Sequence, residues 1–266
     1  MPWQPGQRQH AGPDVCFQTL ISYGGCGIPY YVSGDVPDEE ELRKTSFHKL
    51  RDASFFQNAK GVRIRTATRA LAINRQEKVV EVEDVFSQEK GTIPYDKLVI
   101  ATGAQPFLLP IPGAELEGVF TISDLHKAIS IKKKLAQGEV DRAVVIGGGA
   151  IGLEMAESLA DLWGVETSVV EFMPQILPRA VDPVFARMVQ YHMETHGVHI
   201  YTGEGAQAIE ADANGRACRV VTPNRVIETD MVIMAAGVRP RSKLAQEAGL
   251  NISPMGGIVV NKRLQK

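Results

Sequence analysis

The sequence has little that would suit a membrane, a nucleic acid or an oxidising compartment. Its 266 residues carry a formal net charge of −2, so no excess of positive charge marks a nucleic-acid or anionic-membrane surface. No apolar run approaches the ~20 residues of a transmembrane helix, and the polar start MPWQPGQRQHAGPD lacks a signal-peptide core. The three cysteines, Cys16, Cys26 and Cys218, form no disulfide framework. We therefore expect a cytoplasmic protein without nucleic-acid or membrane partners, and an unstructured segment at residues 1–14.

The most informative pattern lies in residues 141–172. A short apolar strand is predicted at Arg142–Ile146, an amphipathic helix at Ala150–Trp163 and a second strand at Val165–Val170. Between the first strand and the helix, three glycines have G-x-G-x-x-G spacing: Gly147, Gly149 and Gly152. Because strand, glycine turn, helix and strand follow one another in register, the segment predicts a dinucleotide-binding unit.

Each part of this segment has a chemical task. Gly147 permits the turn, Gly149 lets a pyrophosphate approach the backbone, and Gly152 lets the helix lie close to the sheet. Free N–H groups at the helix start would hold the phosphates. Glu171 ends the second strand, where an acid accepts hydrogen bonds from a ribose 2′-OH. No basic residue follows directly to bind a 2′-phosphate, so NADH is favoured over NADPH.

A second candidate is Cys26, which stands among glycines in SYGGCGIPYY. Pro29 suits the first turn of a helix and Gly34 would end it, so Cys26 is expected at or near a helix N-terminus. That position would stabilise the thiolate and make the residue reactive. The alternative is a small buried cysteine without chemistry. Tyr31 stands five residues on, so Cys26 has no resolving partner in a C-x₄-C pair.

The remaining elements are predicted from hydrophobic period. The expected helices are Asp38–Phe56 (one or two), Ser123–Gln137 with Lys132–Lys134 on its solvated face, Asp182–His196 and Ser242–Ala248. The expected strands are Val62–Arg65, Val79–Val85, Thr92–Tyr95, Lys97–Ala101, Val198–Tyr201, Ala206–Glu210, Ala217–Thr222, Val226–Glu228, Met231–Ala236 and one beginning at Gly257–Val260. His192, His196 and His199 are interpreted as surface histidines and not as a metal site, because H-M-E-T-H is not H-E-x-x-H.

Four segments in this order resemble the flavin-dependent pyridine nucleotide-disulfide oxidoreductases: SYGGCGIPYY, YDKLVIATGAQP, VVIGGGAIGLEMAE and AAGVRPRSKLAQEAGL. The resemblance is to the single-cysteine branch, which holds coenzyme A disulfide reductases, NADH oxidases and peroxidases, and persulfide reductases. It implies an α/β, Rossmann-like FAD/NAD(P)-binding fold, with an NAD domain inserted into an incomplete FAD domain. The implied divisions are a partial FAD domain over 15–112, the NAD domain over 113–237 and a return to the FAD domain over 238–266.

The resemblance also implies cofactors and site residues. FAD and NAD are the expected cofactors, and Cys26 is the expected redox-active residue. The residues expected to bind cofactor are Gly147, Gly148, Gly149, Ala150, Ile151, Gly152, Glu154, Glu171, Gly237, Thr102 and Gly103. Ile151 and Glu154 would meet the nicotinamide end, Thr102 and Gly103 would approach the flavin, and Gly237 would line the nicotinamide passage. No metal site is expected.

The implied activity is electron transfer from NADH through FAD to Cys26, and then to a small disulfide, persulfide, peroxide or oxygen. A homodimer is expected for a full-length enzyme of this family. Family members place a first strand, glycine loop and helix before the cysteine segment to hold the FAD pyrophosphate, and residues 1–14 cannot form that unit. The alternative is therefore a truncated, non-catalytic NAD-binding module that lacks a working FAD site.

Overall fold

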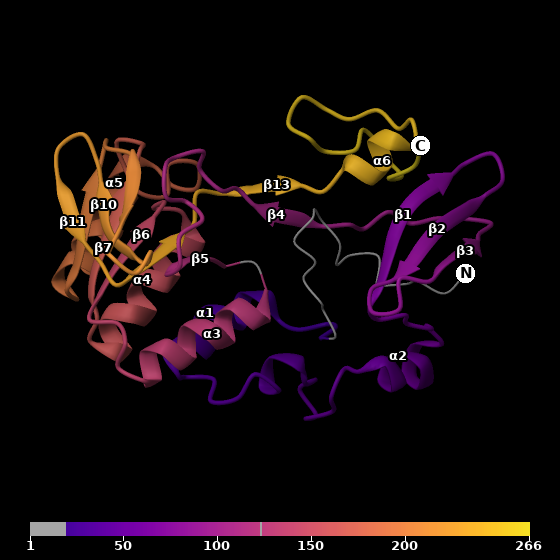
Figure 1. Cartoon of the computed structure of the whole chain (residues 1–266), viewed down its shortest axis with the longest axis horizontal. Helices are drawn as coiled ribbons and strands as arrows, with labels where there is room; N and C mark the ends of the chain where they lie inside the picture. The colour runs from indigo at the N-terminus through magenta and orange to yellow at the C-terminus, as the bar shows by residue number, and fades with distance from the viewer. Residues whose placement is uncertain (1–19, 123) are drawn as a thin grey trace. The chain divides into compact units, whose positions relative to one another are not determined.

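The computed structural model describes residues 20–122 and 124–266. Expectations for residues 1–19, including Cys16, lie outside the described residues. The described residues divide into two compact units, one of residues 24–42, 106–122 and 124–237 and the other of residues 20–23, 43–105 and 238–266. Figure 1 shows the elements of each. None of the described helices is long and apolar enough to cross a bilayer.

A five-stranded parallel sheet forms the centre of the first unit. Its strand order is β5-β12-β6-β7-β8, and every neighbouring pair is parallel. The strands are β5 (Val119–Thr121), β6 (Arg142–Ile146), β7 (Glu166–Glu171), β8 (Val198–Thr202) and β12 (Met231–Met234). Residues of β6 and β12 are almost wholly buried, as expected for a parallel sheet that is covered on both faces.

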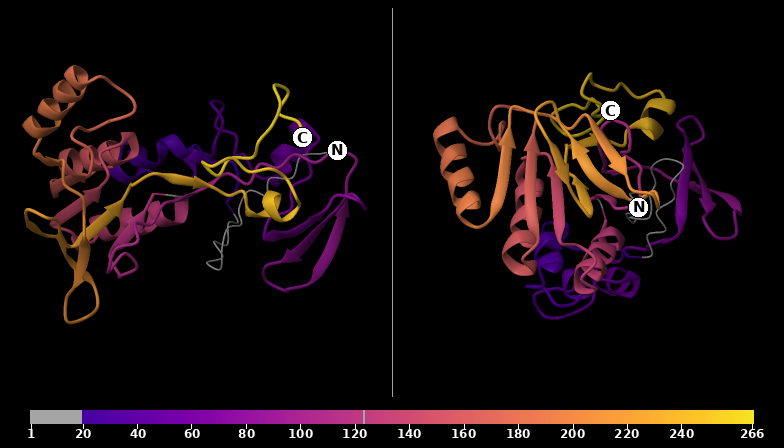
Figure 2. Two further views of the ribbon diagram at one scale, coloured as in Figure 1. Left: turned by 90° about the horizontal axis from the view of Figure 1, so that it is seen from above. Right: turned by 60° about the vertical axis from the view of Figure 1, so that its left-hand side comes forward.

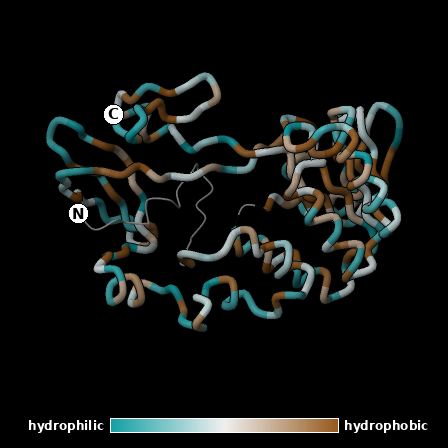
Figure 3. The backbone as a smooth tube through the Cα atoms, turned by 180° about the vertical axis from the view of Figure 1, so that it is seen from behind, coloured by the Kyte–Doolittle hydropathy of each residue, from teal (hydrophilic) through white to brown (hydrophobic). Residues whose placement is uncertain are grey.

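The two faces of this sheet have different cover. Val145 faces helix α4 (Ala150–Trp163), because its side chain approaches Gly152. Val144 faces the other way, into an apolar cluster with Ile209 and Val220. Those two residues belong to an antiparallel sheet of β9 (Ala208–Ala211), β10 (Ala217–Val221) and β11 (Val226–Glu228). Brown, apolar stretches of the tube are frequent within this unit, on the right of Figure 3. The mixed α/β layers confirm the predicted fold class.

Three further helices complete this unit. They are α1 (Ile28–Ser33), α3 (Leu125–Ala136) and α5 (Pro183–Thr195). The Asp124 carboxylate caps α3 by accepting from the Lys127 N–H at 3.0 Å. Helix α5 lies along the edge strand β8 (Figure 2). Helix α1 packs on both α3 and α4, so the segment after Cys26 belongs to the same unit as the parallel sheet.

The second unit is built on an antiparallel sheet. Its strands are β1 (Thr68–Asn74), β2 (Val79–Asp84) and β3 (Lys90–Pro94), in the order β1-β2-β3. Helix α6 (Lys243–Glu247) packs on β1, and Leu244 joins the small core around Val80. Helix α2 (Ala53–Lys60) is capped by Asp52 and ends at Gly61. Strands β4 (Ala104–Pro106) and β13 (Val238–Pro240) form a two-stranded sheet at the two points of the sequence where the chain passes from one unit to the other.

Several expected elements differ from the structure. The helices expected over 38–56 are replaced by a 3-10 turn at Glu41–Arg43 (η3) and a loop, and α2 begins only at Ala53. The strands expected at 62–65, 97–101 and 257–260 do not form; the last holds only an isolated bridge between Ile252 and Ile258. Strand β1 lies at 68–74 and was not expected. A strand forms only when its backbone pairs with a neighbouring strand. No described strand pairs with residues 97–101, and Val99 in the middle of this segment is 65% exposed.

Candidate functional site

The glycine turn after β6 has the geometry of a phosphate-binding loop. Gly147 has φ +115, and a Cβ there would lie 2.5 Å from the Ala235 carbonyl oxygen. A Cβ on Gly152 would lie 2.0 Å from the Gly147 carbonyl oxygen. Both positions therefore exclude a side chain for reasons of internal packing.

Gly149 differs from its two neighbours in the motif. A Cβ at this position would meet nothing within 4 Å, so the space outside the turn is open. Gly149 is also the N-cap of α4, and no described side chain caps this helix. The first N–H groups of the helix are thus available to an anion at the positive end of the helix dipole. These residues fit the pyrophosphate of a dinucleotide.

Glu171 lies at the end of β7 and contacts this loop. Its side chain is buried, at 8% exposure. Oε2 accepts a hydrogen bond from the Gly148 N–H at 2.7 Å, and Oε1 accepts one from the Met173 N–H at 2.7 Å. Each carboxylate oxygen has a second lone pair, which leaves acceptor capacity for a ribose hydroxyl. The structure thus brings the predicted acid and the glycine loop into direct contact.

The exposed side of α4 carries the other predicted residues of this helix. Ile151 is 45% exposed although it is apolar. Glu154, one turn further, is also exposed. Their spacing places them on one face, away from Gly152 and Val145. The face beside the loop is therefore open to a ligand.

Cys26 lies in the 3-10 turn Gly25–Gly27 (η2), directly before α1. Its side chain is exposed, which removes the interpretation of a small buried cysteine. The Gly24 N–H donates to the Leu42 carbonyl at 2.8 Å, and a Cβ on Gly27 would lie 2.5 Å from the Leu42 side chain. The turn therefore presents its thiol to the outside while its backbone is held in place. As expected, Pro29 opens the short helix and Gly34, with φ +104, ends it.

Residues predicted to approach the flavin lie in the second unit. The Thr102 hydroxyl donates to the Arg241 carbonyl, and the Arg241 N–H donates to the Gly103 carbonyl at 2.9 Å. This joins the two predicted motifs at 102–104 and 237–240, whose strands β4 and β13 pair. Gly103 and Gly237 both have positive φ, +71 and +106, and no atoms crowd either position. Gly237 and the glycine loop of residues 147–152 belong to the other unit.

An ion pair between the buried Glu204 and the exposed Arg225 supports the chain beside Glu171. Glu204 is 4% exposed, accepts from the Thr222 hydroxyl at 2.7 Å and lies 3.0 Å from Arg225 Nη2. Burial alone would raise the pKa of Glu204, but the hydrogen bonds from Thr222 and Arg225 outweigh it and hold the pKa below its ordinary value. The Glu204 N–H donates to the Glu171 carbonyl at 3.2 Å, so this pair fixes the backbone at the end of β7. Sequence pattern gave no indication of it.

Neither the histidines nor any other described group forms a metal site. The rings of His192 and His196 lie 4.2 Å apart at the end of α5, and His196 Nδ1 lies 2.8 Å from the His192 carbonyl. Within the described ranges, no cluster of three or more His, Cys, Asp or Glu side chains could hold an ion.

The residues present fit one dinucleotide. In residues 20–122 and 124–266, the combination of strand, glycine loop and helix occurs once, at β6 and α4. These residues hold no second combination of this kind for an FAD pyrophosphate. The one cradle of this kind in the described part therefore fits NAD.

Comparison with known proteins assigns the family. Residues 8–266 match the family model described as pyridine nucleotide-disulphide oxidoreductase. An NADH oxidase from Methanocaldococcus jannaschii is 34% identical over 245 residues, which cover 92% of this chain and 52% of that protein. The structure of an NAD-dependent persulfide reductase from A. fulgidus has 36% identity and a TM-score of 0.88, covering 92% of this chain and 44% of that one. An FAD-dependent pyridine nucleotide-disulphide oxidoreductase from Desulfovibrio vulgaris has 40% identity and a TM-score of 0.69, covering 78% and 51%.

The chain thus spans about half the length of these relatives. NAD(H) and FAD, the cofactors expected from the sequence, are those named for the relatives. The match extends over the glycine loop, the Cys26 turn and the β4–β13 pair. The chain belongs to the pyridine nucleotide-disulphide oxidoreductase family.

Proposed function

We propose that this chain is the NADH-binding part of a flavin-dependent oxidoreductase that reduces a small disulfide or persulfide through Cys26. The observation that carries the proposal is the open N-terminus of α4, with Gly149 facing free space and Glu171 beside the loop. That combination suits a pyrophosphate and its adjoining ribose. The exposed thiol of Cys26, held on the same unit, supports the disulfide or persulfide class of acceptor.

For a disulfide acceptor, the Cys26 thiolate attacks one sulfur, forms a mixed disulfide and releases the other sulfur as a thiolate, which takes a proton from solvent. NADH supplies a hydride, which carries two electrons, and these cleave the S–S bond of the mixed disulfide to give NAD⁺, the Cys26 thiolate and a second thiol. The net reaction converts one NADH, one proton and one disulfide into one NAD⁺ and two thiols. Bound FAD would supply the two-electron relay. This chain's own residues bind the dinucleotide and present the thiol.

The acceptor could also be a peroxide or oxygen, in which case Cys26 would pass through a sulfenate or take no part. A different class of function, an NAD-binding module without catalysis, is favoured by the single dinucleotide cradle in the described residues. Cytoplasmic location and a homodimer of the longer enzyme remain parts of this proposal.

A sequence of measurements on the purified chain separates these functions. NADH and NADPH affinities are measured by nucleotide fluorescence for the wild type and for Gly149→Ala. The visible spectrum is then recorded with added FAD, and NADH consumption is followed with a low-molecular-weight disulfide, a persulfide, a peroxide or oxygen. We expect NADH binding, a flavin spectrum and disulfide- or persulfide-dependent turnover. NADH binding without any flavin spectrum would support the non-catalytic module, and no NADH binding would contradict both.

A further inference from the structure

The helix that follows Cys26 is too short to be stable by itself. Helix α1 has six residues, well below the ~12–15 at which an isolated helix becomes even marginal. Its order must therefore come from contacts with the rest of the unit. Ile28, Tyr31 and Val32 are 4%, 5% and 0% exposed, and they supply the apolar part of that contact.

A polar contact from α4 completes the C-terminal end of α1. The last carbonyls of a helix have no partner within it. One of them, the Val32 carbonyl, accepts a hydrogen bond from the indole Nε1–H of Trp163 at 2.8 Å. The Ser158 hydroxyl also approaches the Pro29 carbonyl, at 3.2 Å, but its single proton has a shorter contact with the Glu154 carbonyl, at 2.7 Å. Trp163 is therefore the stronger anchor from this helix.

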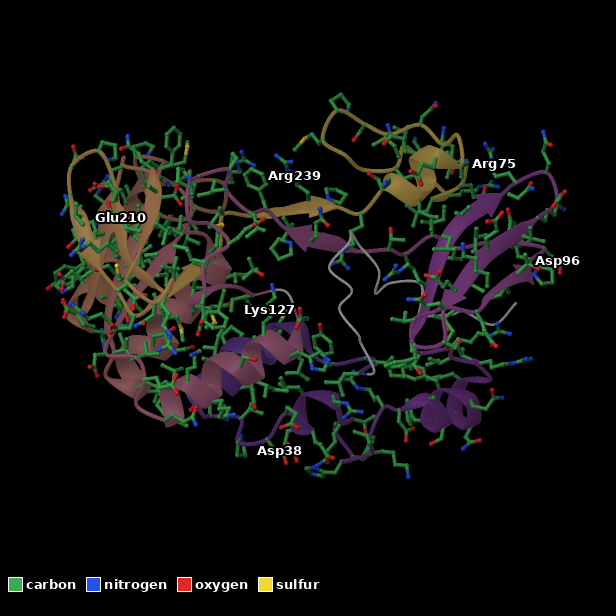
Figure 4. All side chains as sticks on the ribbon, viewed as in Figure 1. Asp38, Arg75, Asp96, Lys127, Glu210 and Arg239 are labelled. Carbon is green, nitrogen blue, oxygen red and sulfur yellow. The ribbon has the colours of Figure 1, made fainter. Side chains whose placement is uncertain are left out.

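A second anchor comes from α3. Lys132 Nζ donates to the carbonyls of Val36 and Pro37, both at 3.1 Å, and lies 4.1 Å from the centre of the Tyr31 ring. Lys132 was expected on the solvated face of its helix, but it is only partly exposed. The pKa of Lys132 lies below its ordinary value, because partial burial lowers it more than the carboxylates of Asp38 and Glu39 raise it. Asp38, labelled in Figure 4, lies on the loop that leaves α1.

We propose that Lys132 and Trp163 are positioning residues for Cys26, which hold α1 and the following loop on the nucleotide-binding unit. The inference rests on the proposed function. All groups concerned belong to residues 24–42 and 106–237, one compact unit. Helix α4 therefore has two tasks: its N-terminus provides the dinucleotide cradle, and Trp163 at its C-terminal end anchors the helix that carries the thiol. Cys26 and the proposed NADH site are thus held by the same compact unit.

Matched variants separate the anchors from ordinary surface residues. Lys132→Met keeps the side-chain stem and removes the donors, Lys132→Arg retains a cation with donors, and Lys133→Met is the control at the exposed neighbouring residue. Trp163→Phe keeps an aromatic ring and removes the N–H. Hydrogen exchange is measured for peptides spanning residues 24–36 and, as an internal reference, residues 142–146. The alkylation rate of Cys26 by iodoacetamide is compared with that of Cys218.

We expect exchange over 24–36 to be about tenfold faster in Lys132→Met and a few-fold faster in Trp163→Phe, because charged hydrogen bonds are worth more than neutral ones. Cys26 alkylation should shift toward its rate in the urea-denatured chain, while Cys218 is unaffected. Lys132→Arg and Lys133→Met should behave like the wild type. In the FAD-loaded protein, kcat with a disulfide acceptor should fall while the KM for NADH stays the same.

Unchanged exchange and alkylation in both anchor variants would overturn the proposal. Faster exchange with unchanged kcat would also overturn it, since the anchors would then stabilise the fold without positioning the thiol. If the wild type shows no NADH-dependent turnover, the proposed function fails, and the alkylation of Cys26 alone decides the anchoring. Those two failures are distinguishable because alkylation requires neither NADH nor an acceptor.

Discussion

The Gly148 N–H donates a hydrogen bond to the Glu171 carboxylate at 2.7 Å, which joins the phosphate-binding loop to the proposed ribose-binding acid. The residues are 23 positions apart in the chain. Because Oε1 also accepts from the Met173 N–H, the carboxylate orders the backbone on both sides of the site. Glu171 therefore has a structural task in addition to the proposed contact with the ligand.

From this contact we predict two separable effects of Glu171→Ala. The Gly148 N–H loses its acceptor in a buried place and the Met173 N–H in a partly buried one, so the free energy of unfolding in urea should fall by about 1–3 kcal/mol. NADH affinity should fall while NADPH affinity falls less, which nucleotide fluorescence measures. Stability lost with an unaltered NADH/NADPH ratio would limit Glu171 to the structural task.

The two glycines at opposite sides of the loop should respond differently to alanine. Gly149→Ala places a methyl group in open space, so the melting temperature should hardly change, whereas NADH affinity should fall about tenfold or more because the methyl group meets the pyrophosphate. Gly152→Ala would place its Cβ 2.0 Å from a backbone oxygen, and overpacking of this kind costs about 1–3 kcal/mol or more. Thermal unfolding and NADH titration on the pair test the distinction. Equal affinity in Gly149→Ala and wild type would contradict pyrophosphate binding at this loop.

How far the sequence predicted the structure depends on whether the signal is local. Strand β6 and helix α4 match their predicted bounds, because the apolar period, Gly149 and the C-terminal Gly164 all lie within the segment. The strand expected at 97–101 fails because a strand requires a partner, and no described strand pairs with it. The Trp163–Val32 hydrogen bond joins residues 131 positions apart. No short-range pattern could have predicted that contact, or the partial burial of Lys132.

The buried carboxylate of Glu204 should make stability depend on acid. Its pKa in the folded state lies below the ordinary value, since the hydrogen bonds from Thr222 and Arg225 outweigh the opposing effect of burial. Its contribution is therefore present above the unfolded-state pKa and is lost as pH falls through the folded-state pKa. We predict that the free energy of unfolding falls more steeply between about pH 5 and pH 3 in wild type than in Glu204→Gln. The unfolding free energy is measured in urea at each pH. An equal pH dependence in wild type and Glu204→Gln would contradict this assignment.

The last prediction concerns the thiol itself. Cys26→Ser keeps the size and exposure of the side chain but removes the nucleophile, so NADH-dependent reduction of a small disulfide by the FAD-loaded protein should fall at least about 100-fold. NADH affinity should stay the same, because the glycine loop and Glu171 are untouched. Cys218→Ser, in strand β10, is the matched control and should retain full turnover. Turnover with a disulfide that survives in Cys26→Ser would show that electrons reach the acceptor without this thiol, whereas turnover that survives only with oxygen would separate an oxidase reaction from the thiol-dependent one.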